Sequence, residues 1–449
     1  MITKLQINKT LLCLAIGLVA GVANAEMTAD EVSRLDKDLT PVGAERAGNK
    51  DGTIPAWTGG ITKPPANFDI NKGYANPFAA EKPLYVITAA NVDQYKDKLA
   101  PGQIELLKRY PTYKMNVYPS HRTSSLPQGL YDAIKTEGPK IKLTENGGLA
   151  NREKSTVPFP TPKNGLEVLS NHVLRYFGDS WTRSNAEIPV QSNGTFTPVT
   201  RTETILSPNA LEGADANRVF YYLGKITGPS SVAGEAILMH EVIDHAKESR
   251  STWVYNPGSR RVLRAPQISH DSPGIGSDGL RTVDDRFGFF GSAERYNWKL
   301  VGKKEMIISY NNFRLSDRSL KYKDIIKPTN MNPDDIRYEL HRVWVVEATL
   351  KPGMRHVYGK RTMYFDEDSW SLAHSDKYDG RGELWRVREM HNMPYYDAQM
   401  TWDIAHVMYD LQARRYVVTD MVNEERPMKF GQKYNLNNFT TDALRRQGN

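Results

Sequence analysis

The chain has 449 residues, of which 39% are hydrophobic and 25% are charged, so it is long enough to bury a large core. Its 59 basic and 52 acidic side chains give a net charge of +7. Removing residues 1–25, which hold Lys4 and Lys9 and no acidic residue, leaves +5. This small excess argues against a nucleic-acid-binding protein. The single cysteine, Cys13, precedes residue 26, so the rest of the chain has no disulfide and no thiolate metal site.

Residues 1–25 have the pattern of a cleaved signal peptide. Lys4 and Lys9 precede an apolar run of about 13 residues, which is too short to span a bilayer. Ala23-Asn24-Ala25 is a small-residue cleavage site, so we expect cleavage after Ala25. No second apolar run of membrane-spanning length follows. The sequence therefore predicts a soluble protein of the periplasm.

Residues 26–160 are expected to form an irregular arm that wraps around the main domain. Their Gly- and Pro-rich stretches show neither helical nor strand periodicity. Short helices are expected near residues 89–109, where apolar side chains return at helical spacing on both sides of Pro101. The arm also carries many aromatic residues, which disordered segments usually lack.

The segment 161–449 is expected to be one mainly β domain. An amphipathic helix is predicted over residues 164–177, and strands dominate after it. The clearest pattern is at residues 341–390, where four alternating runs of about 8 to 12 residues are joined by tight turns at Pro352-Gly353, Glu367 and Asp379-Gly380. This pattern predicts an antiparallel meander.

The stretch "STWVYNPGSRRVLRAP", residues 251–266, predicts a hairpin with an Asn-Pro-Gly-Ser turn. A four-residue turn pairs Tyr255 with Arg260, Trp253 with Val262 and Ser251 with Arg264. Strand alternation then places Trp253, Tyr255 and Val262 on one face of the hairpin. Neither face is purely polar, which favours a sheet covered on both sides or a curved sheet with an apolar concave face.

The segment "TVDDRFGFFGSAERYNW" predicts a short helix or turn that presents aromatic side chains to the sheet. Thr282 is a suitable N-cap, and Asp284 and Asp285 suit the first turn of a helix. Phe287, Phe289 and Phe290 follow directly.

Three motifs that could indicate chemistry lack either the spacing or the structural context that this chemistry needs. "HEVIDH" places His240 and His245 five residues apart, whereas a zinc-binding helix needs four. "GIGSDG", residues 274–279, matches a dinucleotide-binding pattern but follows loop composition instead of a strand. The acidic run 366–368 lies at a predicted hairpin tip, so a solvated turn is favoured over a pair of catalytic carboxylates.

The aromatic pattern leaves two readings open, an ordinary core and a core with a hollow for an apolar ligand. In the second reading, large aromatic side chains line the hollow and arginines at its mouth meet an anionic or polar head group. The candidate wall and lid residues are Trp253, Tyr255, Phe287, Phe289, Phe290, Trp298, Trp344 and Trp385, and the candidates for the mouth are Arg260 and Arg264.

Several motifs resemble a known family. They are "LTPVGAERAGNKDGTIPAWTGG", "TWVYNPGSRRVLRAP", "DDRFGFFG", "RVWVVEATLKPGMRHVYGKRTMYFDEDSW" and "YDGRGELWR". Together they are similar to a Gram-negative periplasmic domain-of-unknown-function family labelled outer-membrane lipoprotein-sorting-like. The resemblance implies a LolA/LolB-type fold, which is mainly β (α+β). Such a fold is a large curved antiparallel sheet (half-barrel) with helices on its concave side, and in this chain we expect a wrapping N-terminal arm in addition.

The resemblance also implies an apolar cavity for a lipid or another hydrophobic molecule, and relatives that act beside an RND-type efflux pump and an outer-membrane protein. It implies no catalytic residues and no cofactor. The chain is longer than a simple carrier of this kind and lacks a lipid-anchoring cysteine motif. The leading hypothesis is thus a periplasmic carrier without chemistry of its own. The alternatives are a periplasmic hydrolase acting on a lipid or polymer and a structural adaptor for an outer-membrane protein.

Overall fold

A computed structural model describes residues 27–66, 68–144, 146–265 and 270–448. The predicted signal peptide lies outside the described residues. The largest element of the described chain is one sheet of 16 strands, which is not closed because β1 and β10 lie at its opposite ends. None of the helices in the described ranges has the length and apolar character needed to cross a bilayer.

The strands follow one another across the sheet in a nearly sequential order. From one end to the other they are β1 (Tyr85–Ile87), β2 (Met115–Val117), β12 (Tyr338–Leu350), β13 (Lys360–Asp366), β14 (Leu372–Tyr378), β15 (Leu384–Tyr395), β16 (Met400–Asp410), β17 (Arg415–Met421), β5 (Ser180–Val190), β6 (Val199–Leu206), β7 (Arg218–Gly228), β8 (Ala236–Val242), β9 (Ser251–Asn256) and β10 (Arg261–Arg264). β11 (Tyr296–Ser309) also pairs with β12, β18 (Lys429–Phe430) pairs with β5, and β3 (Lys142–Leu143) and β4 (Leu149–Ala150) form a separate hairpin.

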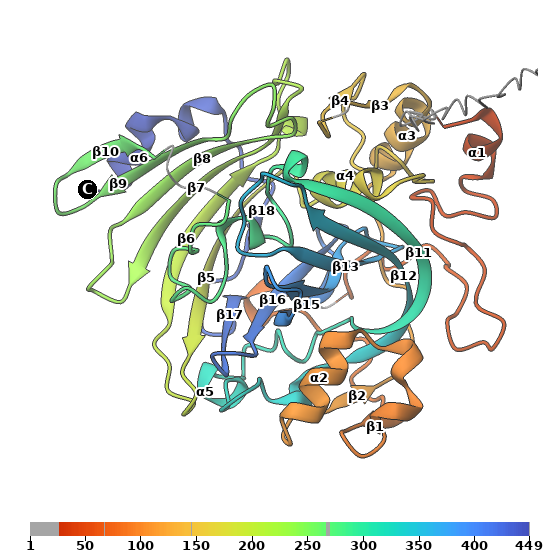
Figure 1. The fold of residues 1–449 in the computed structure, drawn as a ribbon. Coiled ribbons are helices and arrows are strands. Elements are labelled where there is room, and N and C mark those ends of the chain that lie inside the picture. Colours follow the sequence, from red (N-terminus) through yellow and green to blue (C-terminus); the bar gives the residue numbers. More distant parts are fainter. Residues whose placement is uncertain (1–26, 67, 145, 266–269, 449) are drawn as a thin grey trace, which may run out of the picture.

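The sheet is strongly curved, as the mainly β half-barrel prediction requires (Figure 1). The long strand β11 arches along one side of the molecule. Its pairing with β12 shifts between Leu300 and Gly302, and Gly302 has a φ of 140°. An extra residue of this kind bends a strand and increases its twist. The predicted meander is confirmed by β12 to β15, although β13 begins only at Lys360.

Helices cover both faces of the sheet. The helices are α1 (Ala29–Arg34), α2 (Pro101–Arg109), α3 (Gln128–Glu137), α4 (Gly165–Leu174), α5 (Tyr322–Ile325) and α6 (Thr441–Gly448). α4 lies within the curve of the sheet, between β5 to β8 and β11 to β13 (Figure 1). On β15, Val387 packs close to Gly102 of α2, and the neighbouring Arg388 donates to the carbonyl of Gly288 at 2.9 Å. Successive strand residues point to opposite faces, so α2 and the 282–290 segment cover opposite sides of the sheet.

The helix predicted over residues 164–177 is observed as α4, which ends three residues earlier. Its N-cap is Asn164, whose side chain accepts the N–H groups of Leu166 and Glu167. The helices expected near residues 89–109 are two 3₁₀ turns, over residues 92–94 and 96–98, followed by α2.

The N-terminal arm wraps around the sheet and also contributes two strands to it. Val117 of β2 pairs in parallel with Tyr338 of β12. Leu39 and Val42 lie in a buried cluster with Trp370, whose indole N–H donates to the carbonyl of Val42 at 3.1 Å. The arm is thus part of the core and not a separate layer.

The predicted register of the 251–264 hairpin is wrong. The structure pairs Tyr255 with Val262 and Trp253 with Arg264. The side chain of Asn256 accepts the N–H of Ser259 at 3.0 Å, and Arg260 takes a left-handed φ of 54°, so the return strand begins at Arg261. The shift is an even number of residues and therefore keeps each side chain on its predicted face.

Candidate functional site

The candidate site is an apolar pocket of about 90 Å³ between β7, β8 and the segment 274–290. It is lined by Arg201, Phe220, Tyr222, Ile237, Met239, Glu241, Arg250, Gly274, Ile275, Arg281, Val283, Arg286, Phe287 and Phe290. A smaller pocket of about 40 Å³ adjoins it and shares Arg201, Tyr222, Ile237 and Ile275. The two together run along one face of the sheet toward β9.

Strand alternation decides which side chains reach the pocket. On β8, Ile237 and Met239 line it, whereas Leu238 between them packs with Leu444 of α6. On β7, Phe220 and Tyr222 line it, whereas Tyr221 also belongs to the cluster under α6. This part of the sheet is therefore apolar on both faces, one covered by α6 and the other by the 274–290 segment.

The predicted N-cap at Thr282 organises the opposite wall of the pocket. Val283–Asp285 is a 3₁₀ turn in which Thr282 donates its N–H to Asp285 at 3.1 Å. Asp284 is held by Arg361 at 2.6 Å and Asp285 by Lys377 at 3.3 Å. With the turn fixed in this way, the predicted presentation of aromatic side chains to the sheet is observed.

The three phenylalanines of this segment go to two places. Phe287 and Phe290 enter the pocket and contact Phe220, with ring centroids 6.1 and 5.2 Å away. Phe289 points elsewhere and packs on Trp298 at 5.3 Å. Phe287 has a left-handed φ of 51°, which is strained for a non-glycine residue.

Two arginines of the pocket share one carboxylate. Arg281 donates to both oxygens of Glu187, at 2.7 and 2.9 Å, and Arg201 also bonds Glu187. Burial by itself raises the pKa of Glu187, but Arg281 and Arg201 outweigh it and leave this pKa below its ordinary value. Glu187 is thus a fully buried anion with two cationic partners.

Arg286 belongs to a second buried network. It bonds Glu203 and lies 3.0 Å from Asp420, and both of these carboxylates also bind Arg183, at 3.0 and 2.6 Å. The hydroxyl of Tyr222 donates to Glu203 at 2.9 Å. These contacts fix the orientation of Arg286 at the pocket wall.

The third network joins Arg250, Glu241 and His245. Arg250 lies 2.6 Å from Glu241, which lies 3.4 Å from His245. Burial raises the pKa of Glu241 despite Arg250. Burial and then Arg250 lower the pKa of His245 to about 3, so this imidazole is neutral at ordinary pH.

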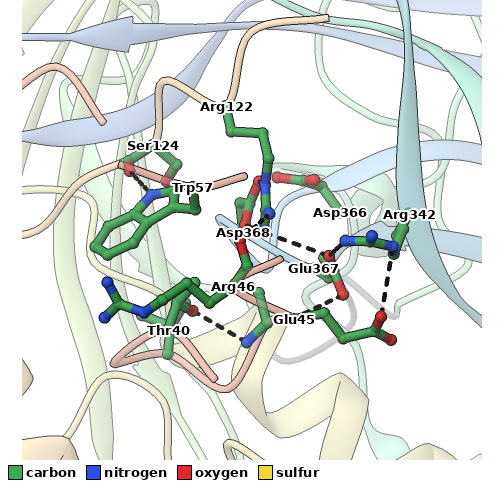
Figure 2. Close-up of polar contacts among 12 residues, drawn as sticks. Thr40, Glu45, Arg46, Trp57, Arg122, Ser124, Arg342, Asp366, Glu367 and Asp368 are labelled. Carbon is green, nitrogen blue, oxygen red and sulfur yellow. Dashed lines mark hydrogen bonds and ion pairs between the residues drawn. The ribbon is translucent and has the colours of Figure 1, made fainter. Parts of the chain in front are cut away.

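A separate group of charges, which we call the arm latch, joins the arm to the turn between β13 and β14. Arg122 donates to both oxygens of Asp368, at 2.8 and 2.6 Å, and lies 3.4 Å from Glu367 (Figure 2). Arg342 and Lys303 bind Glu367 at 3.2 and 2.8 Å. The prediction of a solvated turn at 366–368 is therefore wrong, since all three carboxylates are buried.

Two groups of histidine and aspartate in the described ranges are close enough to hold a metal ion, and in both the protein already supplies the cations. In the group His341, Asp366 and Asp368, Arg122 binds Asp368. In the group Asp403, His406 and Asp420, Arg388 donates to Nδ1 of His406 at 3.1 Å. Nε2 of His406 then carries the proton and donates to Asp403, which leaves it no lone pair for a metal.

The structure brings only two of the ten candidate ligand-binding residues to the pocket, Phe287 and Phe290. Trp253 and Tyr255 lie on the opposite face of the sheet, under α6. Arg260 and Arg264 are exposed on the β9–β10 hairpin. The other four are apart from the pocket: Phe289 and Trp298 pack on each other, Trp344 stacks on Trp370, and Trp385 donates to Asp410 at 3.0 Å.

The pocket residues that sequence reasoning missed are its four arginines and the strand residues of β7 and β8. Arg201 lies inside the alternating run "VTRTETIL", and an arginine in the interior of a strand is a signal for a buried ion pair. Arg281 and Arg286 flank the predicted N-cap segment. Nothing in their local sequence indicates that they meet Arg201 and Arg250 in space.

Comparisons with known proteins agree with the family expected from the motifs. A family described as "Protein of unknown function (DUF1329)" matches residues 86–445. An uncharacterized protein of Pseudomonas aeruginosa is 46% identical over 442 residues, which cover 97% of this chain and 97% of that protein. Among solved structures, the chain is similar to a domain from Vibrio parahaemolyticus named after outer membrane lipoprotein sorting (16% identity, 63% of this chain and 98% of that chain, TM-score 0.44). It is also similar to a LolA superfamily protein from Nitrosomonas europaea (16% identity, 63% and 100%, TM-score 0.39). The family match over most of the chain shows that this protein belongs to the DUF1329 family.

Proposed function

We propose that the protein binds a lipid or another hydrophobic molecule in the pocket under β7 and β8 and carries it without changing it chemically. The observation that supports this is the pocket itself, an unfilled space with walls of Phe220, Ile237, Met239, Phe287 and Phe290. Burial of an alkyl group in such a space stabilises a complex by roughly 0.8 kcal/mol per CH₂. Of the ten candidate ligand-binding residues predicted from the sequence, we propose Phe287 and Phe290 as ligand contacts.

The pocket must widen to accept a whole lipid. Its volume of about 90 Å³ is well below the roughly 300–1,000 Å³ of common small-molecule pockets. The sheet side is fixed by strand pairing, whereas the segment 274–279 is a loop with left-handed Gly276, Asp278 and Gly279. Ile275 of this loop lines the pocket and is 38% exposed. We propose that the loop moves outward when a ligand enters.

The proposed place of action is the periplasm, supported by the basic start, apolar run and cleavage site of residues 1–25. In that compartment a carrier passes its ligand between membranes, and an RND-type efflux pump and an outer-membrane protein are the proposed partners. We propose these partners because the sequence motifs resemble a family whose members are expected to act beside such proteins.

Hydrolysis is the second candidate, and the pocket lining favours binding over it. Among the described residues that line the pocket there is no serine, histidine, aspartate or cysteine. Glu241 and His245 are paired next to it, but the nearby Ser170 donates its hydroxyl to the carbonyl of Leu166 at 2.9 Å instead of to His245. No nucleophile activated by a base faces the cavity among the residues described.

The proposal is tested by measuring how tightly a fluorescent apolar probe binds to the protein and to a variant whose pocket is filled by a larger side chain. Met239→Trp adds an indole inside the pocket, and we expect it to weaken probe binding at least tenfold. Val301→Trp is the control, because Val301 is 53% exposed on β11 outside the pocket lining. Mass spectrometry of lipid extracts from the purified protein then identifies the natural ligand. Equal probe affinity for both variants would contradict this site, and no probe binding by the unmodified protein would contradict the function.

A further inference from the structure

We propose that this pocket selects an amphiphile with an anionic head group, a carboxylate or a phosphate ester. The inference rests on the proposed function and names the class of ligand that the site takes. It depends on three observations about the arginines of the pocket, none of which concerns its apolar walls.

The first observation is the sign of the charges that face the cavity. Among the described residues, the lining contains Arg201, Arg250, Arg281 and Arg286 but only one acidic residue, Glu241. The carboxylates that compensate these arginines, chiefly Glu187 and Glu203, are 0% exposed and lie behind the pocket wall. A ligand in the pocket therefore meets the guanidinium groups before it meets the carboxylates.

The second observation is an excess of positive charge. Glu187 is shared by Arg201 and Arg281, so one carboxylate compensates two guanidinium groups. Charges taken out of water need a partner, and here the protein supplies too few.

The third observation is a set of buried donors without acceptors. Arg201 Nε, Arg250 Nη1 and Arg286 Nη1 have no hydrogen-bond partner among the described residues. The side chains of Arg201 and Arg250 are only 8% and 7% exposed, so bulk water does not solvate them freely. Buried donors of this kind are rare in proteins and costly. An oxygen-rich anion is the ligand that would satisfy several of them at once.

Apolar side chains and guanidinium groups line the same pocket. Phe220, Met239 and Phe290 contribute apolar surface, while Arg201 and Ile275 line the main pocket and the smaller one beside it. An alkyl chain on the apolar surface therefore has guanidinium groups within reach of its head group. A cationic head would be repelled there, and a neutral alcohol offers one oxygen and no charge.

The proposal is tested by displacing the apolar probe with four compounds that have the same alkyl chain and different head groups. They are dodecanoate, dodecyl phosphate, dodecanol and dodecyltrimethylammonium. We expect both anions to bind at least tenfold more tightly than dodecanol, and the cation to bind most weakly. The order of the two anions distinguishes a fatty-acid head from a phosphate head. Equal affinities for dodecanoate and dodecanol would overturn the proposal while leaving the function intact. Failure of all four compounds to displace the bound probe would also overturn the proposal, whereas absence of probe binding would remove the function.

Arg201→Gln is the most informative variant, because Arg281 remains to pair with Glu187 one to one. We expect affinity for dodecanoate to fall about tenfold and affinity for dodecanol to stay unchanged. Glu187→Gln removes the compensating charge instead and should raise the affinity for dodecanoate. Arg261→Gln, on the exposed edge strand β10, is the matched control. If Arg201→Gln fails to fold, Arg281→Gln makes the same test, and a uniform loss for all ligands in either variant counts against charge selection.

Discussion

The arm latch and the pocket are two buried clusters of arginine and carboxylate that differ in how far their charges are matched. In the latch, the turn between β13 and β14 brings three adjacent carboxylates inside, and the arm supplies Arg122 to bind them. In the pocket, four arginines from three parts of the chain line the cavity, and Glu187 is shared by two of them. The latch therefore holds the arm with charges that the chain itself provides, whereas the pocket has more arginines than carboxylates in its lining.

Loss of Arg122 is the largest effect that this comparison predicts. Arg122→Gln leaves Asp368 buried without its arginine partner, and removing one partner of a buried ion pair costs about 3–5 kcal/mol. We expect urea unfolding to show a loss of that size, and proteolysis of residues 27–57 to become faster. Ligand selectivity should not change.

Arg34→Gln provides the control for this experiment. Arg34 pairs with Asp38 in the same arm, but the two side chains are 51% and 57% exposed. An exposed pair of this kind contributes little to stability, because water solvates both charges. Equal effects of the two substitutions would show that the latch does not hold the arm.

The pH dependence of stability tests the burial of adjacent carboxylates in the latch. Burial and then Asp368 raise the pKa of Asp366 to about 6, above its unfolded value of 3.8. A raised carboxyl pKa favours the folded state at low pH, and this contribution is lost as pH rises from about 4 through about 6. Asp366→Asn removes the titration, so we expect it to be more stable than the unmodified protein at pH 7 by about 1–3 kcal/mol. A pH profile between 4 and 7 that is the same in both proteins would contradict this origin.

The contrast between the two clusters also shows what the sequence could predict. Alternation and turn residues were enough for the meander from β12 to β15 and for the cap at Thr282, because these signals are local. The face of each residue in the 251–264 hairpin was also predictable, because an even shift in register preserves it. Which of the two faces looks into the curve depends on where α6 packs, and no local pattern contains that information.

The errors at charged residues have a related cause. The acidic run 366–368 has the composition of a solvated turn, and it is buried only because Arg122, 246 residues before Asp368, folds back over it. The pocket arginines likewise come together from β6, the residues before β9 and the 274–290 segment. Charges that are compensated over such distances in sequence cannot be distinguished from surface charges before the chain is folded.

A disulfide that ties the 274–279 loop to β6 tests whether this loop must move for a ligand to enter. A Cβ placed on Gly276 lies 3.5 Å from the Cβ of Val199 on β6, within the range of a disulfide. In a Cys13→Ser chain, oxidised Val199→Cys/Gly276→Cys should take up the apolar probe at least tenfold more slowly, and a reductant should restore the rate.

The single variant Gly276→Cys controls for strain, because Gly276 has a φ of 82°, where a side chain costs about 1–3 kcal/mol. It should bind the probe at the normal rate. Fast uptake by the oxidised double variant would mean that ligands enter without movement of the 274–279 loop.

Substitution of the exposed arginines of the β9–β10 hairpin should have the smallest effect. It distinguishes selection inside the pocket from attraction by surface charge. Arg260 and Arg264 were the residues predicted for the mouth of the hollow, yet both are exposed and form no ion pair with a described residue. Water already solvates their charges, so replacing both with glutamine should change stability by no more than about 0.5 kcal/mol. Their removal should also leave the ratio of dodecanoate to dodecanol affinity unchanged, in contrast to Arg201→Gln. If the ratio instead falls as far as it does in Arg201→Gln, the head group is attracted by the overall positive field of this end of the molecule, and the unmatched donors inside the pocket do not select it.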